Sequence, residues 1–393
     1  MITVDQARAI ITNALLPCGS ETISYSEACG RILSAPVLAQ RTQPPFAASA
    51  MDGYALRSQD LGDTPASLTL SGESAAGHSH QGCVAPGQAI RISTGAPIPP
   101  GADQVVIQEN TTRDGDTIVL NDTPRPMSNI REAGIDFNQG DELLPAGTLI
   151  SADAIALIAG AGLIQLDVYR KPKVGILSTG DELVEPGEIT GPDQIINSIS
   201  KGLDGLIRQW GGEPVYLGIA RDTPDDVKAK LAATEDLDLV VTIGGASVGD
   251  HDHLRSTFAD QGGQLAFEKV AVKPGKPTWF GQLGATHFVG LPGNPVSALV
   301  TARLFLRPAV EALTGQAISN SMSTATLGTD LPANGAREIY IRAERDPKNV
   351  TVAPLKKQDS SALSALVRSD MLIRRPIEAP AAKTGETVEI LVL

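Results

Sequence analysis

The stretch of the chain that most suggests chemistry is a run of small, acidic and imidazole residues after an apolar segment. Residues 240–243 are apolar or β-branched, and residues 244–253 then read Gly-Gly-Ala-Ser-Val-Gly-Asp-His-Asp-His. Such a segment is typical of a buried parallel strand, whose carboxyl end opens a site. Backbone N–H groups beside small residues can approach an anion closely, and carboxylates can hold a metal next to it. The pattern therefore predicts phosphate chemistry.

Three further polar loops follow predicted strands. Residues 178–182 read Ser-Thr-Gly-Asp-Glu, residues 291–298 read Leu-Pro-Gly-Asn-Pro-Val-Ser-Ala, and residues 273–277 read Lys-Pro-Gly-Lys-Pro. Surface lysines are usually solvated, but Lys273 and Lys276 share a turn that prolines stiffen, which favours a direct role in binding an anion. Because the carboxyl ends of parallel strands meet at one edge of a sheet, we expect the four loops to converge.

Residues 171–315 have the periodicity needed to position these loops. Apolar strand patterns alternate with helical patterns, which favours a doubly wound α/β domain with helices on both faces of its sheet. The predicted strands cover residues 174–177, 215–220, 239–243, 265–272, 278–280 and 287–291, and the predicted helices cover residues 197–210, 224–234, 254–261 and 294–313.

Three other segments flank this domain. Residues 1–40 and 136–170 predict a helical and extended domain for linking and dimerisation, whose first helix begins with a capping box at Thr3. Residues 41–135 predict a small, mostly β domain, and residues 316–393 show the short alternating strands of a small β-barrel. We therefore expect a multidomain α/β plus β protein.

The composition limits the classes of protein to which the chain can belong. It has 393 residues, and no apolar run approaches the ~20 residues needed to cross a bilayer, so we expect a cytoplasmic protein. A formal net charge of −13 argues against a general nucleic-acid surface. Cys18, Cys29 and Cys83 lack Cys-x-x-Cys spacing and are expected to be free, packed thiols.

Six motifs in a fixed order carry a family resemblance over essentially the whole chain. They are Pro-Pro-Phe at 44–46 with Ser-Ala-Met-Asp-Gly-Tyr-Ala at 49–55, Ser-Thr-Gly-Ala-Pro at 93–97, Ser-Thr-Gly-Asp-Glu-Leu at 178–183, Gly-Gly-Ala-Ser-Val-Gly-Asp at 244–250, Lys-Pro-Gly-Lys-Pro at 273–277 and Leu-Pro-Gly-Asn-Pro-Val-Ser-Ala at 291–298. Together they resemble the MoeA family of molybdopterin molybdenumtransferases, which is related to the gephyrin E domain.

The resemblance implies an elongated homodimer of four-domain subunits, with a site between the α/β domain of one subunit and the small β domain of its partner. It implies insertion of molybdate into adenylylated molybdopterin, with Mg²⁺-dependent release of AMP, to give molybdenum cofactor. The implied further partners are the molybdopterin adenylyltransferase and apo-molybdoenzymes, with no nucleic acid and no membrane. Hydrogen-bond donors and cations suit the molybdate dianion, and a divalent metal suits cleavage of a phosphoanhydride.

Site residues follow from the resemblance by motif position. Acidic groups at the metal and phosphate side, which are both catalytic and metal-binding, are Asp181, Glu182 and Asp252. Further catalytic positions are Asp222 and, from the partner subunit, Asp52 and Thr94. The implied substrate and molybdate-binding positions are Lys269, Lys273, Lys276, Pro277, Pro292, Pro295, Arg337, Ser360, Gly244, Gly245, Ser247 and Asp136. Helix capping stays an alternative role for Asp181 and Asp222.

The chain departs from the family pattern in two places. Ala47 and Ala48 stand where an Asp-Asn pair is usual, and His251 and His253 stand where tyrosines are usual. Alternating acid and imidazole groups at 250–253 suggest zinc, but no distant Cys or His cluster completes a tetrahedral site.

Two other functions are compatible with parts of the sequence. A molybdopterin adenylyltransferase-like enzyme has a fold similar to residues 171–315, but it would be a far shorter chain with a Gly-Gly-Thr-Gly loop. A catalytically inactive MoeA-like scaffold would be free to lose its charged site residues, which this chain keeps.

Overall fold

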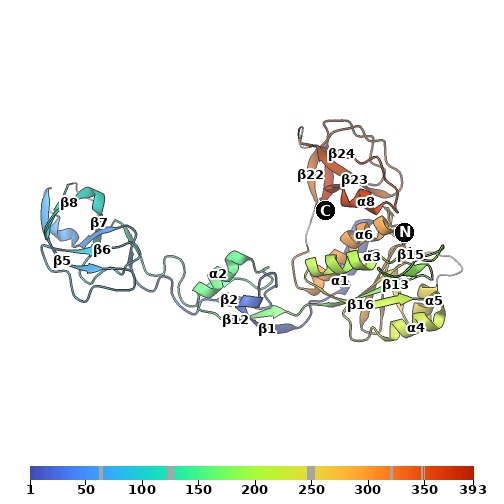
Figure 1. Cartoon of the computed structure of the whole chain (residues 1–393), viewed down its shortest axis with the longest axis horizontal. Helices are drawn as coiled ribbons and strands as arrows, with labels where there is room; N and C mark the ends of the chain where they lie inside the picture. Colours follow the sequence, from blue (N-terminus) through green and yellow to red (C-terminus); the bar gives the residue numbers. More distant parts are fainter. Residues whose placement is uncertain (62–64, 122–127, 246–252, 319–321, 347, 349) are drawn as a thin grey trace.

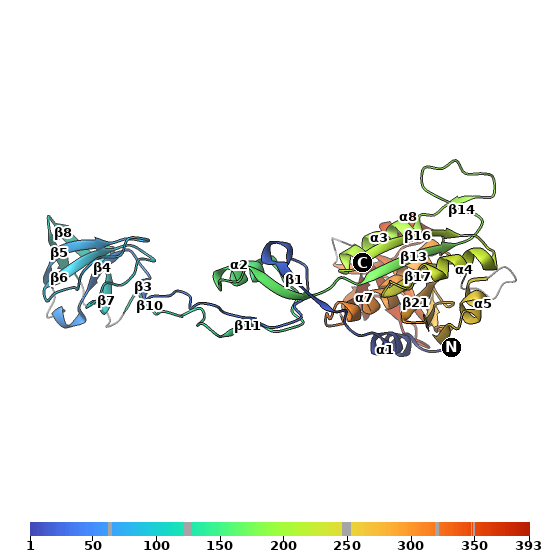
Figure 2. The same cartoon turned by 90° about the horizontal axis from the view of Figure 1, so that it is seen from below.

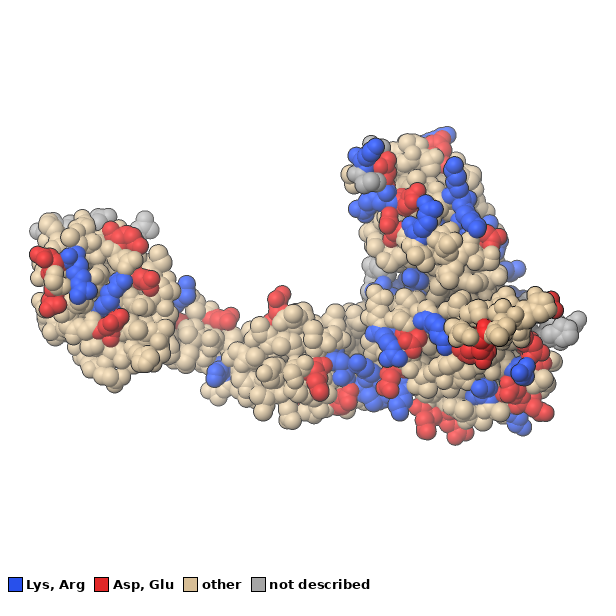
Figure 3. Space-filling view, viewed as in Figure 1, with Lys and Arg blue, Asp and Glu red and all other residues tan. Residues whose placement is uncertain are grey.

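The structure, a computed structural model, describes residues 1–393 apart from 62–64, 122–127, 246–252, 319–321, 347 and 349. The chain is elongated (Figures 1 and 2). A small β unit lies at one end, an α/β unit and a second β unit lie at the other, and thin linking strands join them. Charged groups of both signs are interspersed over the face in Figure 3, and no extended basic surface is visible among the residues coloured there.

A six-stranded sheet forms the centre of the α/β unit, in the order β16-β13-β17-β21-β20-β18. The first four strands in this order are parallel, whereas β20 is antiparallel to β21 and β18 is antiparallel to β20. The bounds are β13 (Lys173–Thr179), β16 (Glu213–Ala220), β17 (Leu239–Ile243), β18 (Gln264–Phe267), β20 (Trp279–Leu283) and β21 (Thr286–Leu291).

Helices cover both faces of this sheet, so the doubly wound α/β prediction is confirmed. Successive strand residues point to opposite faces, and Val241 accordingly packs with one set of helices while Val240 packs with the other. The first set is α3 (Ile199–Gln209), α6 (Pro295–Thr301), the π-helical η4 (Ala302–Leu306) and α7 (Arg307–Leu313), and the second is α4 (Pro224–Ala232) and α5 (His253–Asp260).

The predicted strand over residues 265–272 is wrong in one respect. β18 ends at Phe267, and the chain then leaves the central sheet. Ile2 pairs with Val270, and β19 (Val272–Lys273) pairs in parallel with β23 (Glu338–Asp346) of the C-terminal unit. The apolar residues 270–272 are buried by these new neighbours, after the exposed Glu268 and the partly buried Lys269.

The C-terminal strands form a closed barrel. Its sheet has the order β19-β23-β24-β22-β26-β25, and β25 also pairs with β23, which closes the ring. This outcome agrees with the predicted β-barrel. The remaining elements of this unit are β22 (Met322–Leu327), β24 (Thr351–Pro354), α8 (Leu363–Val367), β25 (Met371–Arg375) and β26 (Thr387–Val392).

The small β unit has its own sheet, in the order β7-β4-β6-β5-β9-β8. The short pair β3 and β10 lies beside it where the linking segment begins. The bounds are β3 (Ala48–Ser49), β4 (Gly53–Leu56), η2 (Ser58–Asp60), β5 (Ala66–Ser74), β6 (Gln88–Ile92), β7 (Gln104–Ile107), η3 (Gln108–Asn110), β8 (Thr111–Asp114), β9 (Thr117–Leu120) and β10 (Ile130–Arg131).

The linking segment consists of two antiparallel strand pairs and a helix. β1 pairs with β12, and β2 pairs with β11. The bounds are β1 (Ser20–Ser24), η1 (Tyr25–Glu27), β2 (Val37–Leu38), β11 (Glu142–Leu144), α2 (Ala152–Gly160) and β12 (Gln165–Tyr169).

The first helix, α1 (Val4–Ala14), does not pack with this segment, although residues 1–40 are grouped with it on sequence grounds. Its predicted capping box is present, since the Thr3 side chain accepts from Gln6 and the Gln6 side chain accepts from Thr3. The buried face of the helix, Val4, Ala7 and Ile11, belongs to the apolar core that contains α7 and η4. The start of the chain therefore lies with the α/β unit.

Two minor expectations have a mixed outcome. All three cysteines are free, but only Cys18 is buried, whereas Cys29 and Cys83 are exposed. Burial raises the pKa of the Cys18 thiol to about 11.

Within the described part of the chain, no helix is long and apolar enough to cross a membrane.

Candidate functional site

The carboxyl edge of the central sheet opens into a cavity of ≈ 740 Å³. Residues of the loops that follow β13, β17 and β21 line it, and the lysine loop contributes Pro277. The cavity is lined by Thr179, Gly180, Glu182, Leu183, Ile195, Ile196, Asn197, Ser198, Ile199, Asp222, Ile243, Gly244, Gly245, Pro277, Pro292, Gly293, Asn294, Pro295 and Ser361. The four polar loops therefore meet here, although the lysine loop arrives from the barrel and not from a strand of the central sheet.

The side of the cavity that carries Asp181, Glu182 and Asp222 is called the acidic side, and two hydrogen bonds connect its loops. The Asp181 amide donates to Asp222 Oδ2 at 3.4 Å, and the Asp222 amide donates to Asp181 Oδ1 at 3.3 Å. Thr223, and not Asp222, caps α4, and no helix follows Asp181 directly. The capping alternative is thus wrong for both residues, and both carboxylates stay close to the cavity with an open side toward solvent.

Glu182 depends on the glycine before it. Gly180 has φ +140°, and a Cβ at this position would lie 2.3 Å from the Glu182 carboxylate. The exposed Glu182 side chain thus folds back over Gly180 at the cavity wall. Asp181 faces a smaller adjoining cavity of ≈ 510 Å³, together with Gly180 and Arg221.

The glycine loop after β17 is shaped by two positive backbone angles. Gly244 has φ +84° and Gly245 has φ +58°, and a Cβ on Gly244 would lie 2.9 Å from the Thr179 carbonyl oxygen. Glycine therefore lets this loop pack directly on the end of β13. Ser247, His251 and Asp252 lie outside the described residues. Among those that are described, no group of three His, Cys, Asp or Glu side chains is arranged to hold a metal.

The lysine loop is a closed turn with free cations. The Val270 amide donates to the Lys276 carbonyl at 3.0 Å, and the Thr278 hydroxyl donates to the Gly275 carbonyl at 2.8 Å. Lys273 and Lys276 are exposed. Neither makes a hydrogen bond or ion pair through its side chain within the part of the chain that the structure describes, so both can accept an anion as a partner.

The barrel brings further site residues to the same edge. In the parallel pair β19 and β23, Lys273 lies opposite Ile339 and Val272 lies opposite Glu338. Because partners in register share a face and neighbours alternate, Lys273 and Arg337 lie on the same face of this pair. Ser360 accepts the Val296 amide at 3.0 Å through its carbonyl, which attaches its loop to the start of α6.

Lys269 and the loop prolines have structural roles as well. Lys269 is partly buried and lies next to Val270, which pairs with Ile2. Pro292 is buried. Pro295 occupies the first turn of α6, where a backbone N–H would have no partner within the helix, so its absence costs no hydrogen bond.

One wall of the cavity lies outside the predicted site. The short parallel pair β14 (Leu183–Val184) and β15 (Ile195–Ile196) folds over the cavity, and Ile195 is 58% exposed. Asn197 Nδ2 donates to the Tyr216 hydroxyl at 2.9 Å, and the Ser178 hydroxyl donates to Asn197 Oδ1 at 3.1 Å. The only sequence signal for this wall is the pair of polar residues, Asn197 and Ser198, at the start of the predicted helix.

Asp52 and Thr94 lie in the small β unit, at the other end of the elongated chain (Figures 1 and 2). The Thr94 amide and hydroxyl donate to Asp52 Oδ1 at 2.6 and 3.0 Å. The Thr94 donors, with a smaller contribution from Arg91, lower the pKa of the Asp52 carboxyl. These two residues form one polar unit, but within one chain they do not join the cavity.

Asp136 and the two unusual alanines lie near the junction with the linking segment. Asp136 is exposed, and its amide donates to the Gln43 carbonyl at 3.2 Å. Ala47 accepts the Ile98 amide at 2.9 Å through its carbonyl, and Ala48 pairs with Arg131. The loop before Asp52 is therefore attached through its backbone, which requires no polar side chain at either alanine.

Comparison with known proteins gives a consistent result along the chain. Residues 2–162 match the MoeA N-terminal region (domain I and II), residues 175–312 match a probable molybdopterin binding domain, and residues 324–393 match the MoeA C-terminal region (domain IV). A molybdopterin molybdenumtransferase of Haemophilus influenzae is 38% identical over 405 residues, which cover 99% of this chain and 98% of the relative. One of Nostoc is 37% identical over 332 residues, which cover 82% and 76%.

Solved structures give the same picture. A crystal structure of the molybdopterin biosynthesis MoeA protein from Pyrococcus horikoshii has a TM-score of 0.83 and 28% identity, and the match covers 100% of both chains. The resemblance thus includes the arrangement of all units and not only the α/β sheet.

Proposed function

Because this chain belongs to the MoeA family, we propose that it is a transferase of molybdenum cofactor biosynthesis that inserts molybdate into adenylylated molybdopterin and releases AMP. The observation that carries the proposal is the cavity, where acidic groups on the β13 loop face a pocket that the lysine loop and the barrel also border. The matched family regions cover the outer units as well as the α/β unit, which does not favour the shorter adenylyltransferase-like alternative.

The walls of the cavity suit the parts of this substrate. The Gly244 amide donates to the Leu291 carbonyl at 3.1 Å, which holds the glycine loop at the ends of β13 and β21, and the absence of side chains there leaves room for phosphate oxygens to approach. Leu183, Ile195 and Ile196 form an apolar wall for a flat ring system. Lys273, Lys276 and Arg337 provide cations for the tetrahedral molybdate dianion and for the negative charge that develops as molybdate is inserted and AMP is released.

Asp181, Glu182 and Asp222 have the chemistry of a magnesium site. Mg²⁺ prefers oxygen ligands and is usually held by one or two carboxylates, with water and substrate phosphates completing its shell. Asp181 and Asp222 fit that pattern, because the amide of each contacts the carboxylate of the other, whereas among the described residues no three such side chains form a preformed metal site. When bound, Mg²⁺ would neutralise charge on the phosphoanhydride oxygens.

The residues of the chain itself orient the two substrates. The mutual contacts of Asp181 and Asp222 keep their carboxylates at the phosphate side, and Gly180 directs Glu182 along the cavity wall. The lysine loop and Arg337 hold the oxyanion at the opposite side, so that molybdate and the dithiolene end of the pterin approach in one orientation.

We also propose that a second subunit completes the site. Asp52 and Thr94 lie far from the cavity of their own chain, and the elongated shape allows the small β unit to reach the cavity of a second copy. In such a homodimer, each site would combine the acidic and cationic loops of one subunit with the Asp52–Thr94 unit of the other.

The central test replaces one charged residue on each side of the cavity. We expect Glu182→Ala and Lys276→Ala each to abolish molybdate-dependent AMP release from adenylylated molybdopterin, with the fold intact by circular dichroism. Lys383→Ala is the matched control, since it removes an exposed barrel lysine that pairs with Asp330. Near-normal AMP release by both folded site variants would exclude the proposed function.

A mixing experiment tests the shared site. Asp52→Asn and Glu182→Gln homodimers are expected to be inactive alone, whereas subunit exchange creates heterodimers with one intact site. Random exchange should restore about a quarter of wild-type activity, because half of the dimers are mixed and each has one good site of two. Absence of any recovery, with exchange verified by native mass spectrometry, would contradict a site shared between subunits.

A further inference from the structure

The chain segment 269–273, which carries Lys269 and Lys273, is held between two other parts of the molecule. On one side, the Ala271 amide donates to the Ile2 carbonyl at 2.7 Å. On the other side, the Glu338 amide donates to the Ala271 carbonyl at 2.8 Å, and β19 continues this pairing with β23. The position of the two lysines therefore depends on the N-terminus and on the first residues of β23.

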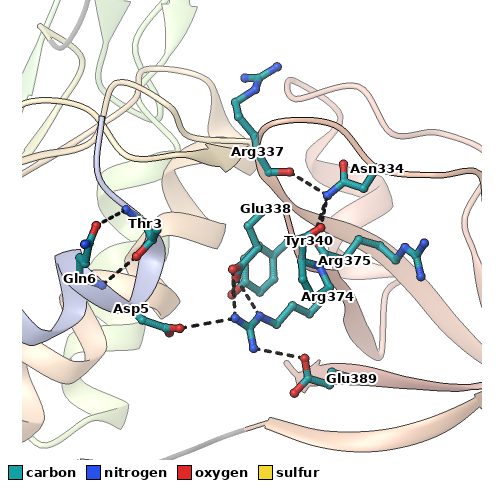
Figure 4. Close-up of polar contacts among 11 residues, drawn as sticks. Thr3, Asp5, Gln6, Asn334, Arg337, Glu338, Tyr340, Arg374, Arg375 and Glu389 are labelled. Carbon is teal, nitrogen blue, oxygen red and sulfur yellow. Dashed lines mark hydrogen bonds and ion pairs between the residues drawn. The ribbon is translucent and has the colours of Figure 1, made fainter. Parts of the chain in front are cut away.

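The side chain of Glu338 anchors the start of β23 from the opposite face. Glu338 is buried, with 5% exposure, and its carboxylate accepts two hydrogen bonds from Arg374 Nε and Nη2, at 2.9 and 3.0 Å (Figure 4). The Tyr340 hydroxyl donates to the same carboxylate at 2.6 Å. Figure 4 shows Arg337, the preceding residue, directed away from this cluster.

Arg374 connects more than one strand. Its guanidinium also reaches Glu389 on β26 at 3.2 Å and Asp5 in the first turn of α1 at 3.7 Å. It thus joins β23, β25, β26 and α1 at one point, next to the N-terminal residues that pair with the lysine segment. The hydrogen bonds to Glu338 raise the pKa of Arg374, so the guanidinium stays charged.

An ion pair between a buried Glu338 and a partly buried Arg374, whose side chains are 7% and 20% exposed, contributes more to geometry than to stability. The attraction between the two charges is largely offset by their loss of hydration, so such a pair is weak support for a fold. Its two parallel hydrogen bonds nevertheless fix the relative orientation of the groups that carry them. Residues behind a binding group commonly set the precision of that group in this way.

We propose that Arg374 is a positioning residue for oxyanion binding, which acts by clamping Glu338 and thereby fixing Arg337 and the lysine segment at the cavity. The inference rests on the proposed function, because it assigns molybdate to these cations. Arg374 does not touch the substrate. It sets where the start of β23 and β19 lie relative to the cavity edge.

The first arm of the test measures kinetics on a variant designed to fold. Arg374→Met alone would leave the buried Glu338 carboxylate without its cation, so it is combined with Glu338→Gln, which can still accept from Tyr340. We expect the double variant to raise the apparent KM for molybdate on the order of tenfold, with the KM for adenylylated molybdopterin unchanged. Arg374→Lys keeps the charge but not the two parallel hydrogen bonds to Glu338. Its KM for molybdate should lie between those of wild type and the double variant.

The second arm measures amide hydrogen exchange in the absence of substrate. We expect the backbone amides of residues 271 and 338 to exchange about tenfold faster in the double variant than in wild type, because their hydrogen bonds open more often. Lys383→Ala removes another barrel ion pair, whose side chains are 70% and 56% exposed, and should change neither readout.

The outcomes distinguish failure of the positioning role of Arg374 from failure of the proposed function. Faster exchange together with a raised molybdate KM supports the positioning role, whereas wild-type KM in the folded double variant overturns it whatever the exchange rates are. If wild type itself showed no molybdate-dependent AMP release, the proposed function would fall. Calorimetric titration with molybdate alone would then test the positioning role of Arg374. Unchanged affinity for molybdate in the double variant would overturn that role.

Discussion

On the acidic side of the cavity, the backbone amides of Asp181 and Asp222 each donate to the other residue's carboxylate, at 3.4 and 3.3 Å. Glu182 is exposed. On the proposed cationic side, Lys273 lies on β19 and Arg337 directly precedes β23, and this strand pair is supported by the contact of the partly buried Arg374 with the buried Glu338. The long hydrogen bonds of the first side can adjust when a cation arrives. On the second side, the backbone that carries the cations is held by strand pairing before any ligand binds.

This difference suits the two ligands. A divalent metal brings its own strong field and can draw carboxylates toward its preferred geometry. An oxyanion imposes no fixed coordination geometry on its donors, so the donors that bind it are more effective when they are already in place. We therefore expect backbone changes on the cationic side to affect the fold, and backbone changes on the acidic side to affect turnover.

The largest effect is expected for Gly275→Ala in the lysine loop. Gly275 is buried with φ +112°, and a Cβ there would lie 2.1 Å from Thr301 Cγ2, which is itself fully buried. We expect a loss of about 2–4 kcal/mol in the free energy of unfolding, measured by urea denaturation. Adding Thr301→Ser removes the methyl group that clashes and should restore part of this loss. Wild-type stability in Gly275→Ala would show that the cationic side is softer than we infer.

The matched change on the acidic side is Gly180→Ala. Its Cβ would meet the end of the Glu182 side chain, which is exposed and can move away. We expect only about 1 kcal/mol of destabilisation from the backbone angle, but about a 100-fold loss of AMP release, because Glu182 is displaced. Wild-type AMP release by folded Gly180→Ala would mean that the position of Glu182 does not depend on Gly180.

The sequence predicts the parts of this arrangement that are local. The sheet and its helices follow from β-branched runs and from capping patterns, as at Thr3, whose predicted capping box with Gln6 starts α1. The acidic and lysine loops follow from motif composition. The meeting of the acidic and glycine loops at one edge follows from the parallel order of β13 and β17, whereas the lysine loop reaches this edge from the barrel.

Contacts between distant segments are not predictable in the same way. Residues 265–272 read as one apolar strand, and nothing local indicates that Val272 pairs with Glu338 instead of extending β18. The strands β14 and β15 have two residues each, which is too short to show a period. The contact of Arg374 with Glu338 joins two barrel strands, so its role behind the lysine segment becomes visible only in three dimensions.

Magnesium should tighten the acidic side and leave the cationic side unchanged. We expect saturating Mg²⁺ to raise the thermal midpoint of wild type by about 2–4 °C, with removal by chelator reversing the shift. Asp181→Asn and Asp222→Asn should each reduce the shift, since a carboxylate ligand is lost, whereas Lys276→Ala should keep it. Differential scanning calorimetry measures all four proteins. An equal shift in every variant would place the metal elsewhere.

The smallest expected effect concerns Asp52, which is exposed like the acidic residues but held as firmly as the cationic ones. Because the Thr94 amide and hydroxyl lower its pKa below the usual 3.8, the stabilisation from these contacts is complete above pH 3.8 and is lost as the pH falls through the lower folded value. Thr94→Val removes the hydroxyl donor but keeps the amide, so it should move the pKa of Asp52 part of the way back up. The titration is measured by following the residue 94 amide in uniformly ¹⁵N-labelled wild type and variant. If the two proteins titrate at the same pH, the hydroxyl contributes nothing to holding Asp52, and the firm presentation of this carboxylate rests on the backbone alone.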